Sequence, residues 1–425
     1  MQPDTPDPAV PARTPTRVVL VEQYFYPDGW GGAEIPRDIA IALTSGGLAV
    51  DVVCGSEQYA PLPPGPPAPD PQAHGVRIVR VPRLLRGPVR RLRLLRVLWF
   101  CLCALPTLLL RPRVALFVTQ TNPPLVVPAV ALVAALRRTP LVIIAQDVYP
   151  EVLFASGLSR GSLSGRLLAH LFAWAYRRAH RVVVLGPFMR ERMLRKGVEP
   201  ERIVTVSNWA TGVLRCQRGA DNPLRAEWQL AQRFVVLYSG NVGIGHEFET
   251  FLRGVARAAR EHDELAVVFI GAGSRLDELR TQVRELGLEG RVSFRDLMPA
   301  ELLPHSMGIA DLALVTLRNG FEGVIVPSKL FGYMARGIPT LYVGPRSDVA
   351  EVIEAADCGA CCPSGDVDAV AKALCRAMES AALLERWSHN GRSYYQRYLT
   401  RELALARYLD LARAAIGAQR STATS

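Results

Sequence analysis

Residues 17–47 read RVVLVEQYFYPDGWGGAEIPRDIAIALTSGG and contain three local signals in a fixed order. The first nine residues are mostly apolar, with β-branched and aromatic side chains, which predicts a buried strand. The segment PDGWGGAE at 27–34 is rich in glycine and predicts a loop, and the apolar spacing after it predicts a helix that ends near two glycines. A strand, a glycine-rich loop and a helix in this order form the first unit of a doubly wound parallel sheet.

The same alternation continues along the chain. In a first series, further strands are predicted by VDVVCG (50–55), VALFVTQ (114–120), PLVIIAQD (140–147) and RVVVLG (181–186). A second series contains RFVVLYSGNVGIG (233–245), LAVVFIGAG (265–273), RVSFRDLMP (291–299), ADLALVTL (310–317) and IPTLYVG (338–344). Since 425 residues exceed what one hydrophobic core usually supports, we expect an α/β protein with two Rossmann-like domains.

The predicted domains are 16–215 and 216–381, preceded by a proline-rich polar tail at 1–15 that we expect to be disordered. Residues 382–416 are predicted to be helical, with a break at Asn390 and Gly391. This helical tail is expected to fold back over one of the two halves, with the N-terminal domain as the favoured one. The first residues contain no apolar segment suited to a signal peptide, so a cytoplasmic location is expected.

Composition and charge narrow the class of partner. Hydrophobic residues make up 49% of the chain and charged residues 21%, which is typical of a globular protein. The net charge of +11 indicates an anionic partner: nucleic acid, a membrane surface or a phosphorylated substrate. Nucleic-acid binding would need a recognition motif or interleaved aromatic residues, and the sequence has neither. The eight cysteines lack the paired spacing of a zinc site, and the single CxxC at 358–361 is expected to be buried small hydrophobes.

Glycines follow several predicted strands, at the edge where doubly wound sheets bind their ligands. The candidates are Gly31 and Gly32 for an acceptor or phosphate loop, and Gly240, Asn241, Gly243, Gly271 and Gly273 for a donor. Without bulky side chains, the backbone amides of such loops can approach a phosphate, although tight turns alone would also explain them. His246 comes just after the second group and is either a donor contact or a loop histidine.

The stretch VPSKLFGYMARGIP at 326–339 predicts a helix that opens with Pro327, Ser328 and Lys329 and ends at Gly337. The free amides of a helix start attract anions, and a lysine there strengthens the attraction. We therefore expect Lys329 to bind a phosphate, with Ser328 either adding a hydroxyl or capping the helix. Glu322, before the helix, either contacts sugar or ribose hydroxyls or is a surface residue.

Two carboxylates follow the predicted strand at 140–147. Asp147 ends the apolar run and stands where the strand opens toward a ligand. It either orients or deprotonates an acceptor hydroxyl, which requires hydrogen-bond reach and a suitable pKa, or it caps the next helix. Glu151, one turn later beside Pro150, is the weaker second candidate for the same acceptor role.

Residues 83–113, RLLRGPVRRLRLLRVLWFCLCALPTLLLRPR, combine many arginines with an apolar run from Val97 to Leu110. Fourteen apolar residues are too few to span a bilayer, which takes roughly twenty. We expect Arg83 to Arg113 to lie in the interface of an anionic membrane. The alternative is a buried helix with a solvated basic start.

Several motifs together resemble the GT-B glycosyltransferases of family 4, in the branch for exopolysaccharide, O-antigen or colanic-acid assembly. They are YFYPDGWGGAE (24–34), AQDVYPEVLFASG (145–157), VSNWA (206–210), YSGNVGIGHEFETFL (238–252) and VPSKLFGYMARGIP (326–339). The resemblance implies sugar transfer from a nucleotide-diphosphate sugar, as substrate rather than cofactor, with retention at the anomeric carbon and no bound metal. It also implies that the donor binds the C-terminal domain and a lipid-linked saccharide acceptor the N-terminal one.

The sequence departs from the wider family at three positions. Ile244 follows Gly243 where many members have a basic residue, Gly332 stands where a second glutamate is usual, and Glu322 lies two residues off the register of the first. Lys329 is then the remaining cation for the diphosphate. The expected protein is a transferase on the inner face of the plasma membrane. A nucleotide-sugar epimerase and a non-catalytic nucleotide-sugar-binding scaffold are the alternatives.

Overall fold

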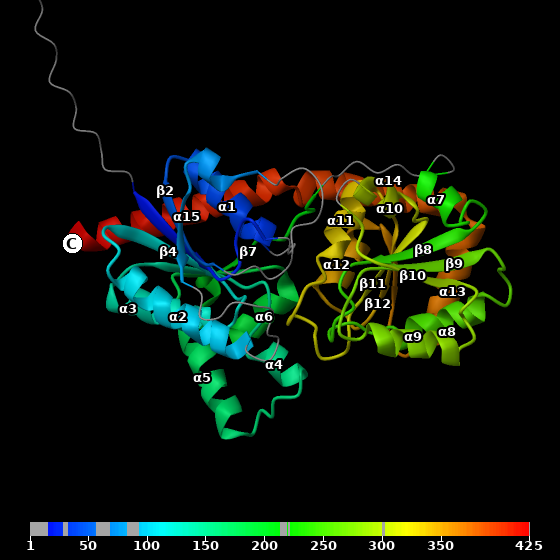
Figure 1. Cartoon of the computed structure of the whole chain (residues 1–425), viewed down its shortest axis with the longest axis horizontal. Coiled ribbons are helices and arrows are strands. Elements are labelled where there is room, and N and C mark those ends of the chain that lie inside the picture. The colour runs from blue at the N-terminus through cyan, green and yellow to red at the C-terminus, as the bar shows by residue number, and fades with distance from the viewer. Residues whose placement is uncertain are drawn as a thin grey trace, which may run out of the picture.

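The computed structural model describes residues 16–28, 33–56, 69–82, 93–212, 219, 222–299 and 302–424. Within these ranges two parallel sheets lie side by side, each flanked by helices, and a long C-terminal helix runs back across the first one (Figure 1). The prediction of two Rossmann-like α/β units is confirmed. The predicted tail at 1–15 and the predicted boundary after residue 215 lie outside the described residues.

The first sheet has seven parallel strands in the order β3-β2-β1-β4-β5-β6-β7. The strands are β1 (Arg17–Glu22), β2 (Ala49–Gly55), β3 (Arg77–Val81), β4 (Val114–Gln120), β5 (Leu141–Ile144), β6 (Arg181–Val184) and β7 (Ile203–Thr205). The helices are α1 (Glu34–Ser45), α2 (Arg93–Leu109), α3 (Val126–Leu136), α4 (Glu151–Ala155), α5 (Leu163–Arg178) and α6 (Pro187–Arg195), with short 3₁₀ turns at Pro71–His74 and Pro200–Arg202. The central strands are unbroken apolar runs because helices cover both faces of the sheet.

The second sheet has six parallel strands in the order β10-β9-β8-β11-β12-β13. The strands are β8 (Phe234–Ser239), β9 (Leu265–Ile270), β10 (Val292–Arg295), β11 (Leu312–Thr316), β12 (Thr340–Val343) and β13 (Gly359–Cys362). The helices are α7 (Pro223–Glu227), α8 (Glu249–Ala258), α9 (Leu276–Glu285), α10 (Leu303–Gly308), α11 (Lys329–Arg336), α12 (Asp348–Ala356), α13 (Val367–Glu379) and α14 (Ala381–Tyr398). Its strand order changes direction between β8 and β11, which places ligands beyond the carboxyl ends of these two strands.

Helix α15 (Arg401–Thr424) returns to the N-terminal unit, as predicted. Its residues Leu405, Tyr408 and Ala412 pack in the core between α1 and the first sheet. The Tyr408 ring meets Trp209 edge-on at 6.3 Å between centroids. At the start of α15, Arg401 forms an ion pair with Asp38 of α1 at 2.5 Å. Since α14 packs in the core of the second unit and α15 in that of the first, the two C-terminal helices connect the halves.

The predicted helix break at Asn390 and Gly391 is wrong, since α14 runs through both and ends at Tyr398. A Cβ at Gly391 would lie 3.0 Å from the Cβ of Cys358, so the glycine allows close packing. The Asn390 amide donates to the carbonyl and the carboxylate of Asp357, both at 3.1 Å. These tertiary contacts outweigh the low helix propensity of the two residues.

The two units contact each other through backbone pairing between the loop after β5 and the loop before α11. The Val148 amide donates to the Val324 carbonyl at 2.8 Å, and Asp147 forms an antiparallel bridge with Ile325. Deeper in, the Phe188 amide at the start of α6 donates to the Asp348 carboxylate at 2.8 Å. Burial raises the pKa of Asp348 to about 6. The carboxyl ends of both sheets therefore face one junction.

Candidate active site

Helix α11 begins at Lys329 and ends at Gly337, whose φ of 65° is the left-handed stop that the sequence predicted. Ser328 precedes the helix, is exposed and makes no capping hydrogen bond with its side chain. The alternative prediction that Ser328 caps the helix with its hydroxyl is therefore wrong, and its donor role stays a prediction. The Lys329 side chain leaves the helix start toward the loop after β8.

Lys329 lies among groups that fix its position. Its Nζ is 3.4 Å from Nε2 of His246 and 4.6 Å from the centroid of the Tyr238 ring. Burial lowers the pKa of Lys329 to about 8, so the ammonium form still predominates at neutral pH. A cation over an aromatic face is stabilised by the ring's electron density, which keeps the charge in place without an acidic partner.

His246 is buried and neutral. Burial first, and then the neighbouring Lys329 charge, lower its pKa to about 3. Its Nδ1 lies 3.0 Å from the Thr316 carbonyl, an acceptor, so Nδ1 carries the hydrogen and Nε2 accepts from Lys329. The His246 carbonyl in turn accepts from Arg275 at 2.6 Å. The histidine therefore orients the lysine, an arrangement that spacing in the sequence did not predict.

The glycine loops after β8 and β9 pack backbone against backbone. Gly240 has φ of 131°, and a Cβ there would lie 2.6 Å from Cε of Lys329. Gly271 has φ of 136°, and its Cβ would lie 2.2 Å from the Gly240 carbonyl oxygen. A Cβ at Gly273 would lie 2.2 Å from the Val242 carbonyl oxygen. These positions require glycine because backbone atoms or the lysine stem occupy the space of a side chain.

The structure brings together most of the predicted donor residues. Gly243 is half-buried beside the exposed Asn241, whose carbonyl accepts from the Tyr238 hydroxyl at 2.6 Å. Gly240, Asn241, Gly243, His246, Gly271, Gly273 and Lys329 form one cluster at the switch between β8 and β11. Their predicted role in binding a donor is untested. Gly31 and Gly32 lie outside the described residues.

Asp147 lies across the junction from this cluster. Its amide donates to the Thr121 hydroxyl at 3.0 Å, and its backbone bridges Ile325, four residues before Lys329. The carboxylate has no hydrogen bond or ion pair with any residue that the structure describes, and it caps no helix. Burial raises its pKa to about 6. A desolvated carboxylate at a domain junction can orient or accept a proton near neutral pH.

The two glutamates have different surroundings. Glu322 accepts from the Gly320 amide at 2.8 Å, and Arg192 donates to its carbonyl at 2.9 Å and lies 3.7 Å from its carboxylate. Glu322 therefore already contacts both units, and its predicted sugar contact is untested. Glu151 pairs with the ammonium of Lys196 at 2.6 Å through one oxygen. Its other oxygen is buried without a partner among the described residues.

Lys196, Arg192 and Tyr238 were not predicted from the sequence. Only three of the 50 basic residues are lysines, at 196, 329 and 372. Two of them, Lys196 and Lys329, lie near the junction of the two units. Because lysine is rare in this arginine-rich chain, its presence at 196 and 329 could have marked both positions as candidate site residues.

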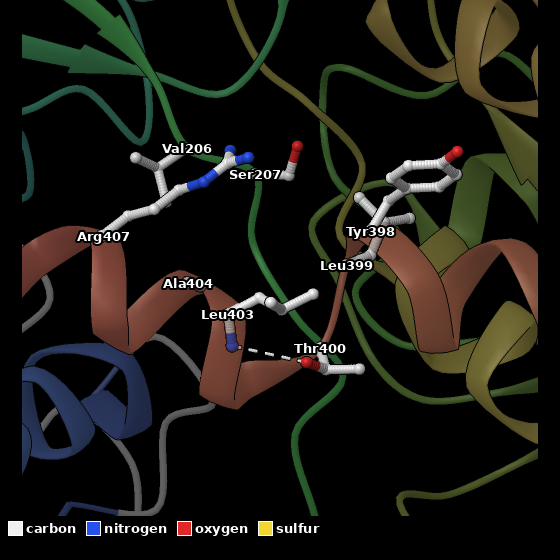
Figure 2. Close-up of a pocket in the computed structure, with 8 residues that line it drawn as sticks. All are labelled: Val206, Ser207, Tyr398, Leu399, Thr400, Leu403, Ala404 and Arg407. Atoms are coloured by element: carbon white, nitrogen blue, oxygen red, sulfur yellow. Dashed lines mark hydrogen bonds between the residues drawn. The ribbon is translucent and has the colours of Figure 1, made fainter.

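Two hollows are near the junction. One, of about 10 Å³, lies where α14 passes into α15, and its lining includes Ser207, Thr400 and Arg407 (Figure 2). It has room for a single water and is a packing defect at the helix crossing. The other has a volume of about 270 Å³ and lies between the two units. It is lined by Glu151, Phe154, Ala155, Arg160, Arg318, Asn319, Gly320 and Phe321.

Comparisons with known proteins find glycosyltransferases among the similar sequences and structures. WbjE of Pseudomonas aeruginosa, a probable glycosyltransferase, is 30% identical over 264 residues, 60% of this chain and 64% of WbjE. WcaI of Escherichia coli K12, a putative colanic acid biosynthesis glycosyl transferase, is 24% identical over 291 residues, 67% of this chain and 70% of WcaI. Anabaena Alr3699/HepE, solved with UDP and glucose, superposes with a TM-score of 0.70 at 17% identity, covering 94% of this chain and 100% of that one.

Two family assignments divide the chain as its two sheets do. Residues 31–209 match the glycosyl transferase 4-like domain, and residues 222–394 match the glycosyl transferases group 1 domain. The first contains Asp147 and Glu151, and the second contains the glycine loops and Lys329. Together the two matches cover both sheets, so the chain has the two-domain organisation of the GT-B glycosyltransferases.

Proposed function

We propose that this protein transfers a sugar from a nucleotide-diphosphate donor to a membrane-held saccharide acceptor during assembly of a surface polysaccharide. The observation that carries the proposal is the half-buried ammonium of Lys329, held by His246 beside two glycine loops at the switch point of the second sheet. The names of the relatives support polysaccharide assembly, and the UDP and glucose of Alr3699/HepE support a uridine-diphosphate donor.

In the proposed complex, the donor diphosphate lies between Lys329 and the backbone amides of Asn241 and Gly243. The amides of Gly240 and Val242 already donate to backbone carbonyls of the neighbouring strand and loop. A charge-assisted hydrogen bond contributes roughly 1.5–3 kcal/mol, and more negative charge collects on the diphosphate as it leaves. Lys329 then stabilises the transition state more than the bound donor. Because the lysine and the helix-end amides supply the positive charge, the proposed reaction uses no metal and no cofactor.

The proposed chemistry retains the anomeric configuration. The acceptor hydroxyl oxygen bonds to the anomeric carbon on the face that the leaving phosphate vacates, while the bond from that carbon to the phosphate oxygen breaks. The hydroxyl proton passes to the leaving phosphate. Asp147, across the junction, orients the acceptor hydroxyl, and its raised pKa of about 6 lets it share that proton.

Membrane attachment is proposed through α2 and its neighbours. One face of α2 packs into the core through Val97, Phe100 and Leu108, while Leu94, Leu98 and Leu102 on the other face are 62%, 47% and 61% exposed. Helix α3 contacts both α2 and α5, and α3 and α5 also carry exposed leucines: Leu132, Leu136, Leu163 and Leu167. Such a patch on a soluble domain is typical of an interaction surface.

The arginines of the predicted membrane segment are only partly described. Residues 83–92 lie outside the described residues, and Arg111 forms an ion pair with the buried Asp51 at 2.7 Å. Arg111 therefore supports the fold and is removed from the set that we propose contacts lipid. No helix in the described ranges is both long enough and apolar enough to cross a bilayer. The proposal places the protein on the inner face of the plasma membrane.

Turnover with a panel of nucleotide sugars and a lipid-linked saccharide tests the function. Nucleotide release only in the presence of acceptor, with NMR of the product showing the donor's anomeric configuration, supports a retaining transferase. Isomerised free nucleotide sugar would indicate an epimerase, and neither reaction would indicate a binding scaffold. Sedimentation with anionic vesicles, comparing the wild type with Leu98→Ser/Leu102→Ser, tests the attachment, and equal binding of the two would count against α2.

A further inference from the structure

The 270 Å³ pocket lies between the units and receives residues from both. Glu151, Phe154 and Arg160 come from α4 and the loop that follows it, and Arg318 and Phe321 come from the loop after β11. The Arg318 amide donates to the Gly245 carbonyl at 2.8 Å, one residue before His246. The pocket therefore adjoins the donor cluster without containing any of its residues.

Two arginines line this pocket, one from each unit. Arg160 is exposed and lies over the Phe154 ring at 5.2 Å from its centroid, which holds its flat face in place. Arg318 is exposed, and only its backbone is hydrogen-bonded. Within the described ranges neither guanidinium forms an ion pair or a hydrogen bond. Two such planar donors are suited to bidentate binding of phosphate oxygens.

Glu151 adds an acceptor to the same pocket. The Lys196 ammonium neutralises its charge at 2.6 Å, so the carboxylate does not repel an anion as a free one would. Its second oxygen is buried without a hydrogen-bond donor among the described residues. Leaving such an oxygen unsatisfied costs about 1–3 kcal/mol, which a ligand hydroxyl would recover.

We infer that this pocket binds the diphosphate and first sugar of the acceptor, with Arg160 and Arg318 on the diphosphate and Glu151 accepting from a sugar hydroxyl. The inference rests on the proposed function. The position favours the acceptor over the donor, because Arg160 lies three residues before the exposed Leu163 of α5. A lipid chain leaving the pocket would meet that apolar face. Since each unit supplies one arginine, the acceptor binds only when the two units are together.

The test is binding of geranyl diphosphate to the full chain by calorimetry, with UDP saturating the donor site. We expect binding that weakens about tenfold in Arg160→Gln and in Arg318→Gln, and further in the double variant. Arg376→Gln, on the exposed face of α13, is the matched control and should bind as the wild type does. The UDP dissociation constant should stay unchanged in all four variants.

The inference would be overturned by no binding by the wild type, by equal binding by the arginine variants, or by an equal loss of UDP affinity, which would assign the pocket to the donor. Inorganic pyrophosphate as a second probe separates a prenyl diphosphate site from a general anion site, and equal affinity for both would also overturn it. Arginine-dependent binding without any sugar transfer would retain the pocket while refuting the proposed function. If the arginine variants transfer sugar with the same acceptor KM as the wild type, the proposed function stands and the pocket assignment is refuted.

Discussion

The two sides of the domain junction differ in how their polar groups are held. On the C-terminal side, both ring nitrogens of His246 have partners, and the lysine ammonium lies against an imidazole and a phenol ring. On the N-terminal side, the Asp147 carboxylate and one oxygen of Glu151 have no partner among the described residues. The Lys329 cluster is held by its neighbours before a ligand arrives, whereas the two carboxylates of the N-terminal side are left for a ligand to satisfy.

This difference indicates how each side contributes to the free energy of ligand binding. A group held by its neighbours loses little freedom when the diphosphate binds, so the donor side is preorganised for charge that develops there. A buried oxygen without a donor raises the free energy of the empty protein, so an acceptor that fills it gains affinity. Substitutions in the Lys329 cluster should therefore affect donor use, and substitutions of Asp147 or of the pocket residues should affect acceptor use.

The largest effect is expected from removal of the lysine charge. Lys329→Ala should lower kcat/KM for the donor about 10- to 100-fold, because a charge-assisted bond to the diphosphate is lost. Steady-state assays at varied donor concentration measure this. Lys372→Ala on the exposed face of α13 removes the same side chain elsewhere and should leave turnover unchanged. If Lys329→Ala folds normally and turns over at the wild-type rate, the diphosphate is bound by other groups.

Gly271→Ala should disturb the backbone packing of the donor loops without changing any charged residue. A methyl group there would lie 2.2 Å from the Gly240 carbonyl oxygen, and φ of 136° is unfavourable for alanine. We expect the free energy of unfolding to fall by about 2 kcal/mol and UDP to bind about tenfold more weakly. Gly290→Ala, whose methyl group meets no atom within 4 Å, is the control. Thermal melts and UDP titration measure both quantities, and wild-type values for Gly271→Ala would refute the packing argument.

The sequence predicted the interior of the fold better than its edges. Central strands such as β4 and β9 are apolar runs rich in β-branched and aromatic residues, which is typical of a buried strand in a doubly covered sheet. The edge strands β3, β7 and β13 were not predicted, because each is short or interrupted by polar or small residues. Strand β13 contains part of the CGACC segment, whose Cys358 is buried beside α14.

The sequence predicted the candidate site only where local residues mark the start or end of a helix. Pro327 and Gly337 mark the two ends of α11, so Lys329 could be placed at a helix start from the sequence alone. The contacts that give this lysine its properties join residues 83 positions apart, and local spacing contains no information about them. The same holds for the pair of Glu151 and Lys196, which are separated by 45 residues.

Asp147→Asn should affect the acceptor side alone. Asparagine keeps the size of the side chain but removes its charge, so we expect turnover at pH 7.5 to fall about tenfold while UDP affinity stays unchanged. In the wild type, burial raises the pKa of Asp147 to about 6, so kcat/KM should decline as the pH falls through that value. The variant should lack this decline. A pH profile of the variant that still falls near pH 6 would assign the titration to another group.

The smallest effect expected is the pH dependence of UDP binding. Burial lowers the pKa of Lys329 from 10.5 to about 8, so the ammonium is lost as the pH rises through about 8. At pH 9 about a tenth of the Lys329 side chains remain charged, and UDP should bind about fivefold more weakly than at pH 7.

The free energy of unfolding should change in the opposite direction. Between about pH 8 and 10.5 the unfolded chain holds the Lys329 proton that the folded protein has lost, so this group makes the fold more stable as the pH rises. Calorimetric titration of UDP at pH 7 and 9, beside thermal melts, separates loss of charge from loss of fold. Lys329→Ala should bind UDP equally weakly at both values, and a pH dependence that survives in this variant would contradict the assignment.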